Sequence, residues 1–313
     1  MTVFLSTLGQ MAQLALFICI GFVLVRAKIL PASGAGLLSR MENWIFVPAL
    51  ILGTFMKNFT PARLSTAWQY LLCGTAVTLF GLVAALLLAP CCTKDAYIRK
   101  LYTYGLTFSN FGFMGNAVVL ALFPDLFADY LIFVIPLWIL IYGWAVPVLL
   151  IPQGSGEKTL RARLKPFVNP MFIAMLAGMI LGLTGLPIPA FFSSACDALG
   201  ACMSPVAMLL TGMTVAATDL RAVFRNKSIY AVTGLRLLLL PLVAILLLML
   251  LPLPEGIAIC VVCSLAMPLG LNTVVVPGAY GLDTSVAAGM ALISHLFSVG
   301  TIPLIFTLFS QLV

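Results

Sequence analysis

Long apolar runs alternate with short polar segments along almost the entire chain. Each run approaches the roughly 20 apolar residues that a helix needs to cross the hydrocarbon core of a bilayer. The first run lacks a basic leader and a small-residue cleavage motif, which favours a retained span over a signal peptide. The connections are short, so we expect no appended soluble domain. The pattern predicts ten spanning helices, at residues 4–25, 35–56, 65–89, 100–122, 128–151, 168–186, 192–217, 229–251, 256–280 and 285–311.

The composition excludes a soluble protein. Of the 313 residues, 63% are hydrophobic and 8% are charged, whereas a soluble domain carries roughly 25% charged residues. We therefore expect an all-α integral membrane protein. The eight cysteines and one histidine show no zinc-site spacing, so the cysteines are interpreted as unpaired packing residues. Neither a metal nor another cofactor is expected.

The basic residues of the connections fall mainly on one side of the predicted bilayer. Thirteen Lys and Arg lie in alternate connections beginning with the first, and only Lys57 and Arg63 lie in the others. Cytoplasmic loops are the ones enriched in Lys and Arg. The pattern predicts a multi-pass protein of the cytoplasmic membrane with both termini outside the cytoplasm. Topology thus explains the net charge of +7, and no nucleic-acid partner is expected.

A weak internal repeat relates the two halves of the chain. A shift of about 157 residues aligns Gly21 with Gly178, Pro31-Ala32 with Pro189-Ala190, Pro48 with Pro205, Gly112 with Gly270, and Asp125 with Asp283. We predict two five-helix repeats, 1–151 and 168–313, joined by a cytoplasmic linker at 152–167. A unit with an odd number of spans must be followed by an inverted copy. Inverted repeats with substrate at their interface are a common plan of transporters.

Two predicted helices carry signals of interruption at repeat-related positions. The segment "FSNFGFMGNAV" (108–118) places glycines and asparagines inside an apolar span, and "LAMPLGLNTVVVPG" (265–278) combines proline, glycine and asparagine. Backbone freed by such a break is tolerated only where it faces protein or a water-filled cavity. The N-terminal ends of the half-helices beyond the breaks would favour an anion.

We therefore predict a substrate site at the two breaks. Small residues and asparagines also serve ordinary helix packing in membranes, but their occurrence at equivalent positions of both halves favours a site. The glycines and the proline would open the backbone, and the asparagines would bind polar substrate atoms. The candidates are Asn110, Gly112, Gly115, Asn116, Pro268, Gly270 and Asn272, with Asn43 as a further candidate from the second span.

Few ionisable side chains lie within the predicted spans. Among the acids, Glu42, Asp129 and Asp197 do so, each near the start of its helix. This placement disfavours a carboxylate-based proton or sodium antiporter, although backbone carbonyls at a break could still hold sodium. We expect Arg236 to extend its charge to the cytoplasmic face. His295 follows Ser294, but neighbouring helical residues point in different directions. A helix–helix hydrogen bond or packing is therefore expected for His295 rather than catalysis.

Several of these stretches together resemble the auxin efflux carrier family. They include "NWIFVPALILGTF" (43–55), "SNFGFMGN" (109–116), "NPMFIAMLAGMILGLTGLPIP" (169–189), "SPVAMLLTGMTV" (204–215), "RLLLLPL" (236–242) and "AMPLGLNTVVVPGAYG" (266–281). The resemblance covers nearly the whole chain. It implies helices 4 and 9 interrupted and crossing near the membrane centre, as in the related bile acid/sodium symporters.

The resemblance also implies a substrate class and a role for one asparagine. Family members carry organic anions, namely auxin in plants and dicarboxylates such as malate or malonate in some bacteria. Asn110 matches an asparagine that contacts substrate in plant carriers, which have proline before it where this chain has Ser109. The long cytoplasmic loop of many plant members is absent, as in a compact bacterial member.

The combined interpretation is a secondary transporter for a small organic anion, and not an enzyme. Alternating access would arise from movement of one bundle of helices against another. The alternatives are a sodium-coupled symporter of bile-acid-transporter type, an intramembrane hydrolase and a membrane sensor. The substrate, the coupling ion (Na⁺, H⁺ or none), the direction of transport and a homodimeric state stay open.

Overall fold

The computed structural model describes residues 2–151, 170–217, 220–251 and 253–312, and these residues are almost entirely helical. Within these ranges the only β-type pairing is an isolated antiparallel bridge between Ser109 and Leu269. The predicted linker at 152–167 lies outside the described residues. The all-α class predicted from the sequence is confirmed.

The helices of the first half follow the predicted spans closely. They are α1 (Thr2–Arg26), α2 (Gly34–Met41), η1 (Glu42–Phe46), α3 (Val47–Asn58), α4 (Pro61–Cys92), α5 (Ala96–Thr107), η2 (Phe111–Gly115), α6 (Asn116–Leu122), η3 (Pro124–Leu126), α7 (Phe127–Phe133), α8 (Ile135–Leu140) and η4 (Ile141–Leu150). The segments η1, η2 and η4 are π-helical turns, wider than the α-helix.

The second half is built similarly. Its helices are α10 (Pro170–Thr184), α11 (Ala190–Ala201), α12 (Met203–Ala216), α13 (Leu220–Arg225), α14 (Lys227–Gly234), η6 (Leu235–Leu239), α15 (Leu240–Leu250), α16 (Glu255–Ala266), α17 (Asn272–Ala279) and α18 (Ser285–Leu312). The segment η6 is again a π-helical turn.

Six helical stretches of the described chain are long and apolar enough to cross a membrane. They are Thr7–Arg26, Pro61–Cys92, Pro124–Leu150, Ala190–Ala216, Lys227–Leu250 and Ser285–Leu312. Shorter apolar helices occur at Phe111–Leu122, Pro170–Thr184 and Glu255–Ala266. The structure is therefore consistent with an all-α membrane protein. The count of ten spans and the inverted repeat stay predictions.

The outer faces of these helices are apolar, as expected for lipid contact. On α4, for example, Leu72, Leu79, Val83 and Leu87 are all exposed. Soluble proteins rarely expose contiguous apolar patches of this extent. In a bilayer the same side chains meet hydrocarbon, so their exposure carries no cost.

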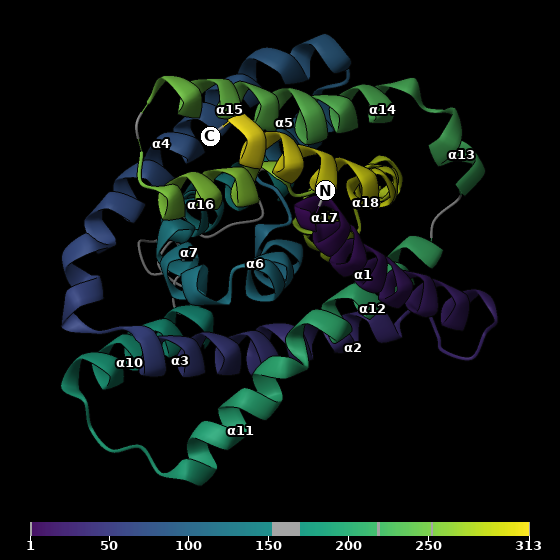
Figure 1. Ribbon diagram of the computed structural model, residues 1–313. Helices are drawn as coiled ribbons and strands as arrows, with labels where there is room; N and C mark the ends of the chain where they lie inside the picture. Colours follow the sequence, from purple (N-terminus) through teal and green to yellow (C-terminus); the bar gives the residue numbers. More distant parts are fainter. Residues whose placement is uncertain (1, 152–169, 218–219, 252, 313) are drawn as a thin grey trace.

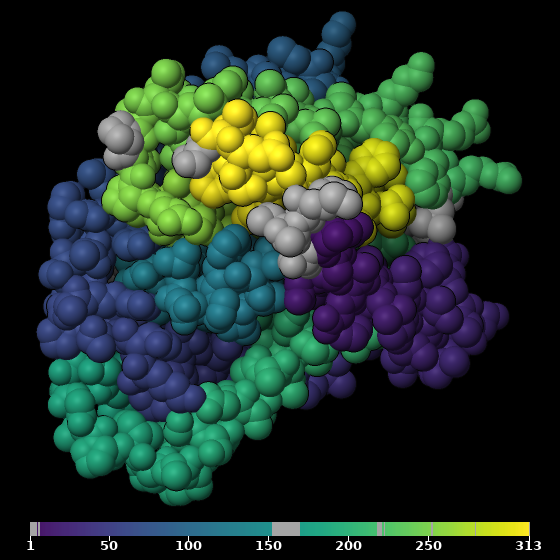
Figure 2. Space-filling view, viewed as in Figure 1, coloured from purple at the N-terminus to yellow at the C-terminus, as the bar shows by residue number. Residues whose placement is uncertain are grey.

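The helices form two groups, which we call the panel and the bundle. The panel consists of α1, α2, η1, α3, α10, α11 and α12, in which α1 packs along α12 and α3 packs along α10 and α11. In Figure 1 α2, α3, α10 and α11 lie in the lower part and α1 and α12 cross the middle; the remaining helices, which form the bundle, lie mostly above α3 and α10. In the space-filling view α10 and α11 project at the lower edge, away from the bundle (Figure 2). Helix α1 also packs along α18 of the bundle.

Two glycine contacts hold the panel together at backbone distance. A Cβ atom on Gly21 of α1 would collide with the carbonyl oxygen of Leu209 on α12. A Cβ on Gly178 of α10 would lie 2.9 Å from the carbonyl oxygen of Leu52 on α3. Small residues are what allow membrane helices to approach this closely. The two contacts are related by the same shift of 157 residues that aligns the two halves of the sequence.

Gly21→Ala tests the α1–α12 contact. Because the added methyl group meets a carbonyl oxygen rather than a flexible side chain, we expect a loss of about 1–3 kcal/mol of stability, as for other overpacked sites. The measurement is thermal unfolding of the detergent-solubilised protein, followed by tryptophan fluorescence. Gly9→Ala, on the same helix with no atom within 4 Å of the new Cβ, is the control. Equal melting temperatures for the two variants would contradict the close contact.

Candidate functional site

Both segments predicted to be interrupted are indeed broken. Helix α5 ends at Thr107 and the chain turns helical again at Phe111, while α16 ends at Ala266 and α17 begins at Asn272. Pro268 supplies no backbone donor and is incompatible with a continuous helix. The two extended segments, 108–110 and 267–271, lie against each other. That the helices cross near the membrane centre stays a prediction.

The two breaks satisfy part of each other's backbone. The Asn110 N–H donates to the carbonyl oxygen of Pro268 at 2.7 Å, and the Ser109 hydroxyl donates to the carbonyl oxygen of Ser264 at 2.7 Å. A Cβ on Gly270 would lie 3.2 Å from the Ser109 carbonyl oxygen. Glycine thus permits the close approach of the two segments, and each break supports the other.

Arg236 supplies the remaining donors and corrects the sequence-based prediction. Its side chain is 1% exposed and does not extend to the cytoplasmic face. The guanidinium donates from Nε to Met267 O at 3.2 Å, from Nη1 to Leu106 O at 2.9 Å and from Nη2 to Ser264 O at 2.8 Å. These carbonyls lie at the C-terminal ends of α5 and α16, where helices carry partial negative charge. Hydrogen bonding to three buried carbonyl oxygens therefore stabilises the protein more than placing the Arg236 charge at the membrane surface would.

Helix α18 provides a second set of polar groups behind the breaks. The Ser294 hydroxyl accepts a hydrogen bond from the Leu269 N–H at 3.2 Å. The His295 ring lies 2.9 Å from the Asn110 side-chain amide (Nε2 to Nδ2) and 2.7 Å from the Ala291 carbonyl oxygen (Nδ1 to O). The helix–helix hydrogen bond expected for His295 is therefore present. Ser294 and His295 contact backbone and amide groups rather than each other.

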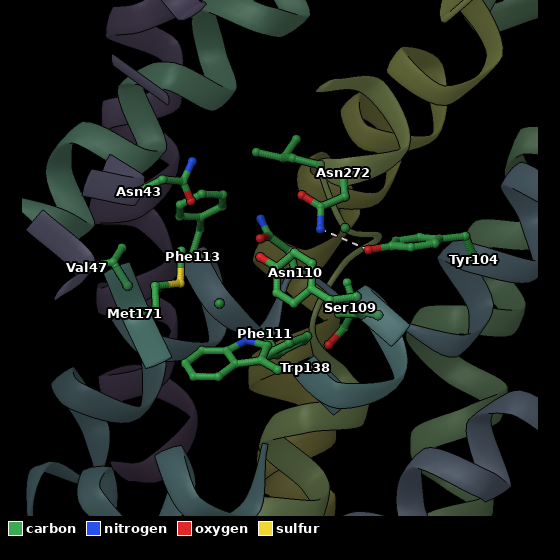
Figure 3. A pocket seen from close by; sticks show the side chains of 15 residues that line it. Asn43, Val47, Tyr104, Ser109, Asn110, Phe111, Phe113, Trp138, Met171 and Asn272 are labelled. Atoms are coloured by element: carbon green, nitrogen blue, oxygen red, sulfur yellow. Dashed lines mark hydrogen bonds between the residues drawn. The ribbon is translucent and has the colours of Figure 1, made fainter. Parts of the chain in front are cut away.

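A cavity of about 60 Å³ opens where the breaks face the panel. One water requires about 10–15 Å³ in this measure, so the cavity holds a few water molecules. Its lining joins both breaks to η1, α3 and α10 of the panel; the residues are Asn43, Val47, Tyr104, Ser109, Asn110, Phe111, Gly112, Phe113, Trp138, Ile141, Tyr142, Met171, Gly270, Leu271 and Asn272. In Figure 3 Asn43 and Asn272 lie on opposite sides, with Asn110 between them.

The structure brings together most of the residues predicted for a site. Five of the eight candidates line the cavity, namely Asn43, Asn110, Gly112, Gly270 and Asn272. Pro268 lies behind the lining, with its carbonyl bound to Asn110. Gly115 packs against Tyr130 and Met267. Asn116 is fully buried outside the lining, and neither atom of its amide has a hydrogen-bond partner.

The polar aromatic residues of the cavity were not predicted. The Tyr104 hydroxyl accepts a hydrogen bond from the Asn272 amide at 2.9 Å, drawn as a dashed line in Figure 3. Trp138 and Tyr142, four residues apart, line the same wall from α8 and η4. Trp138 and Tyr142 could have been recognised from their spacing, which places both on one helical face. Aromatic side chains with a polar tip inside a bundle require a hydrogen-bond partner or water.

The comparison with protein families decides the general activity. A family model described as a membrane transport protein matches residues 6–306. The chain belongs to this family, the auxin efflux carrier family. Its members are membrane transporters and not enzymes. A search of curated proteins finds no significant match.

For this transporter the geometry places the backbone openings of both interrupted helices on one cavity. Of the four π-helical turns in the described residues, η1, η2 and η4 contribute lining residues, and η6 carries Arg236, which bonds the ends of α5 and α16. Such wide turns occur frequently at functional sites of helical proteins. They enlarge the local helix and redirect side chains without ending it.

Arg236→Met tests the role of the guanidinium in this transporter. The substitution keeps an unbranched apolar stem and leaves three buried carbonyls without their donor. Each unsatisfied buried group costs about 1–3 kcal/mol, so we expect a strongly lowered melting temperature or loss of monodisperse protein. Arg236→Lys, which cannot present the planar fork, should be intermediate.

The control is Arg225→Met, because Arg225 is exposed at the end of α13. Thermal unfolding and size-exclusion profiles are compared for the three variants. A wild-type melting temperature for Arg236→Met would show that the three carbonyls do not need this donor.

Proposed function

We propose that this protein is a secondary transporter that moves a small organic anion, a carboxylate or dicarboxylate, across the cytoplasmic membrane by alternating access. The observation that carries the proposal is the cavity between panel and bundle, lined by both helix breaks. A site located at the boundary of two groups of helices becomes accessible from either side when one group moves against the other.

The glycine contacts of the panel support an inverted repeat. Two repeats related by a twofold axis make each contact between them twice, with the partners exchanged. The Gly21–Leu209 and Gly178–Leu52 contacts form such a pair. We infer that residues 1–151 and 168–313 are the two repeats, ten spans in all, with both termini outside the cytoplasm.

The chemistry of the cavity favours an anion. The first turns of η2 and α17 line it, and the N–H groups of a first turn have no partner within the helix. Buried Arg236 adds a full positive charge behind the breaks, and among the described residues no carboxylate forms an ion pair with it. None of the lining residues is Asp or Glu. The lining therefore carries no negatively charged side chain that would repel a carboxylate.

We assign different roles to the candidate residues. Asn43 from the panel and Asn110 and Asn272 from the bundle bind polar atoms of the substrate. Gly112 and Gly270 leave the backbone open to it, while Pro268 and Gly115 shape the breaks. Asn116, buried without a partner, fits direct binding only in a conformation in which η2 has moved.

A thermal-shift screen of the purified protein tests the proposed substrate class. Malate, malonate and indole-3-acetate are compared with neutral and cationic analogues, with and without sodium. A ligand that binds only the folded state raises apparent stability by mass action, so we expect a shift for carboxylates alone. Shifts with cations and none with carboxylates would overturn the anion assignment.

Each carboxylate that shifts the wild type is then tested on Asn110→Ala and Asn43→Ala. Loss of a hydrogen bond to a charged group is worth about 1.5–3 kcal/mol, or roughly a tenfold or larger loss of affinity. Asn58→Ala is the matched control, because Asn58 is exposed at the end of α3, outside the cavity lining. An unchanged shift in Asn110→Ala would place the binding site elsewhere.

Gly112→Ala tests the space in the cavity separately. A Cβ on Gly112 meets no atom within 4 Å, so the ligand-free variant should melt close to the wild type. The methyl group occupies the cavity, and we expect a reduced carboxylate shift. Gly300→Ala, on α18 and equally unobstructed, is the control. A full ligand shift in Gly112→Ala would show that the substrate does not approach this wall.

A further inference from the structure

The single histidine of the chain lies directly behind the cavity. His295 is 2% exposed and contacts the cavity-lining Asn110 through Nε2 at 2.9 Å. Its Nδ1 atom lies 2.7 Å from the Ala291 carbonyl oxygen. A carbonyl oxygen only accepts hydrogen bonds, so Nδ1 must carry a proton. In the neutral ring Nε2 is then unprotonated and accepts from the Asn110 Nδ2 group.

This arrangement fixes the orientation of the Asn110 amide. With Nδ2 donating to His295, the Oδ1 atom is the part of the amide left for the cavity, which Asn110 lines. An amide oxygen in this position repels a carboxylate. The neutral histidine therefore holds Asn110 in the orientation that is wrong for the proposed substrate.

We propose that His295 takes up a proton when the anion binds, which makes the protein a proton–anion symporter. The proton arrives from the bulk solvent as hydronium through water in the cavity, leaves water behind, and adds to the lone pair of Nε2. The Asn110 amide turns over, so that the Nδ2–H···Nε2 bond is replaced by Nε2–H···Oδ1. The Nδ2 group then donates to the bound carboxylate. One positive and one negative charge enter together, and no other covalent bond changes.

The charges around His295 fit this sequence of events. The elements packed against α18 carry exposed Arg26, Arg221, Arg225, Lys227 and Glu255 at their ends, with buried Arg236 on η6. Helices α12, α15 and α17 carry no charged residue. The other titratable side chains on these elements are Cys19, Cys202, Tyr230, Cys260, Cys263 and Tyr280.

On the side away from Asn110, His295 lines an apolar crevice with Cys19 and Phe22 of α1. Among the described residues, no carboxylate is bonded to the ring. Arg236 is the buried cation nearest the breaks, and a second buried positive charge is unfavourable. The charged imidazolium form of His295 is therefore disfavoured as long as no anion is bound. The incoming carboxylate supplies the missing negative charge.

The inference rests on the proposed function, since it assigns the coupling ion of the same site. The first measurement is NMR of the protein labelled with ¹⁵N in histidine and prepared without a polyhistidine tag, so that His295 gives the only ring signals. Ligand-free protein at neutral pH should show the neutral tautomer protonated at Nδ1. Saturation with malonate, or with another carboxylate found in the screen, should convert the ring to the imidazolium.

The second measurement is calorimetric titration with the same carboxylate in two buffers of different ionisation enthalpy. We expect uptake of one proton per bound anion. Because coupling between two ligands is reciprocal, affinity should fall about tenfold per unit of pH between about pH 7 and 9, where malonate itself no longer titrates.

His295→Gln separates coupling from binding. The glutamine amide can hydrogen-bond Asn110 but takes up no proton, so the variant should bind the carboxylate with no proton uptake and no pH dependence. A pH dependence that survives in His295→Gln would overturn the inference and assign the proton to another group, such as buried Glu42. If this variant fails to fold, the NMR result on the wild type decides.

The outcomes distinguish the two proposals. A carboxylate that binds through Asn110 while His295 stays neutral overturns proton coupling and leaves the anion transporter intact. A ligand-free ring protonated at Nε2 overturns the geometry on which the coupling depends. If no carboxylate binds, both proposals fail together.

Discussion

The Arg236 guanidinium lies between the ends of two interrupted helices and donates hydrogen bonds to three of their carbonyl oxygens. Broken helices are costly in a membrane because water is not at hand to satisfy the freed backbone. Here one side chain, supported by Ser109, Ser294 and the contact between the breaks themselves, meets much of that requirement. This compensation stabilises the open backbone that lines the cavity.

The sequence contained the main features of the fold because the membrane restricts the choices. Apolar length predicted the helices, and Pro268 with Gly270 predicted the second break, since proline cannot continue a helix and glycine permits a close approach. The first break at 108–110 carries no proline, and it forms where paired backbone and Arg236 replace the lost helical bonds. That replacement is tertiary and leaves little trace in local sequence.

The difference between local sequence signals and tertiary contacts also explains which of the cavity residues the sequence predicted. Asparagines beside the breaks, such as Asn110 and Asn272, were visible as polar groups in apolar segments. Arg236 and His295 were equally visible, but each has a distant partner: Leu106 is 130 residues from Arg236, and Asn110 is 185 residues from His295. Without those partners, movement of Arg236 to the interface was the reasonable expectation. The local pattern of Asn116 resembles that of Asn110, but the structure buries Asn116 outside the cavity lining, and its role in a site stays a prediction.

The glycine contacts of the panel have a mechanical consequence. At Gly21 of α1 and Gly178 of α10 the helices approach the Leu209 and Leu52 carbonyl groups so closely that an added Cβ atom would collide with them. These pairs therefore behave as a stiff frame. At the cavity the boundary with the bundle is different, because the cavity separates Asn43 and Met171 from the breaks. Slippage between the two groups should be easiest at the cavity, so the softest direction of the molecule passes through the proposed binding site.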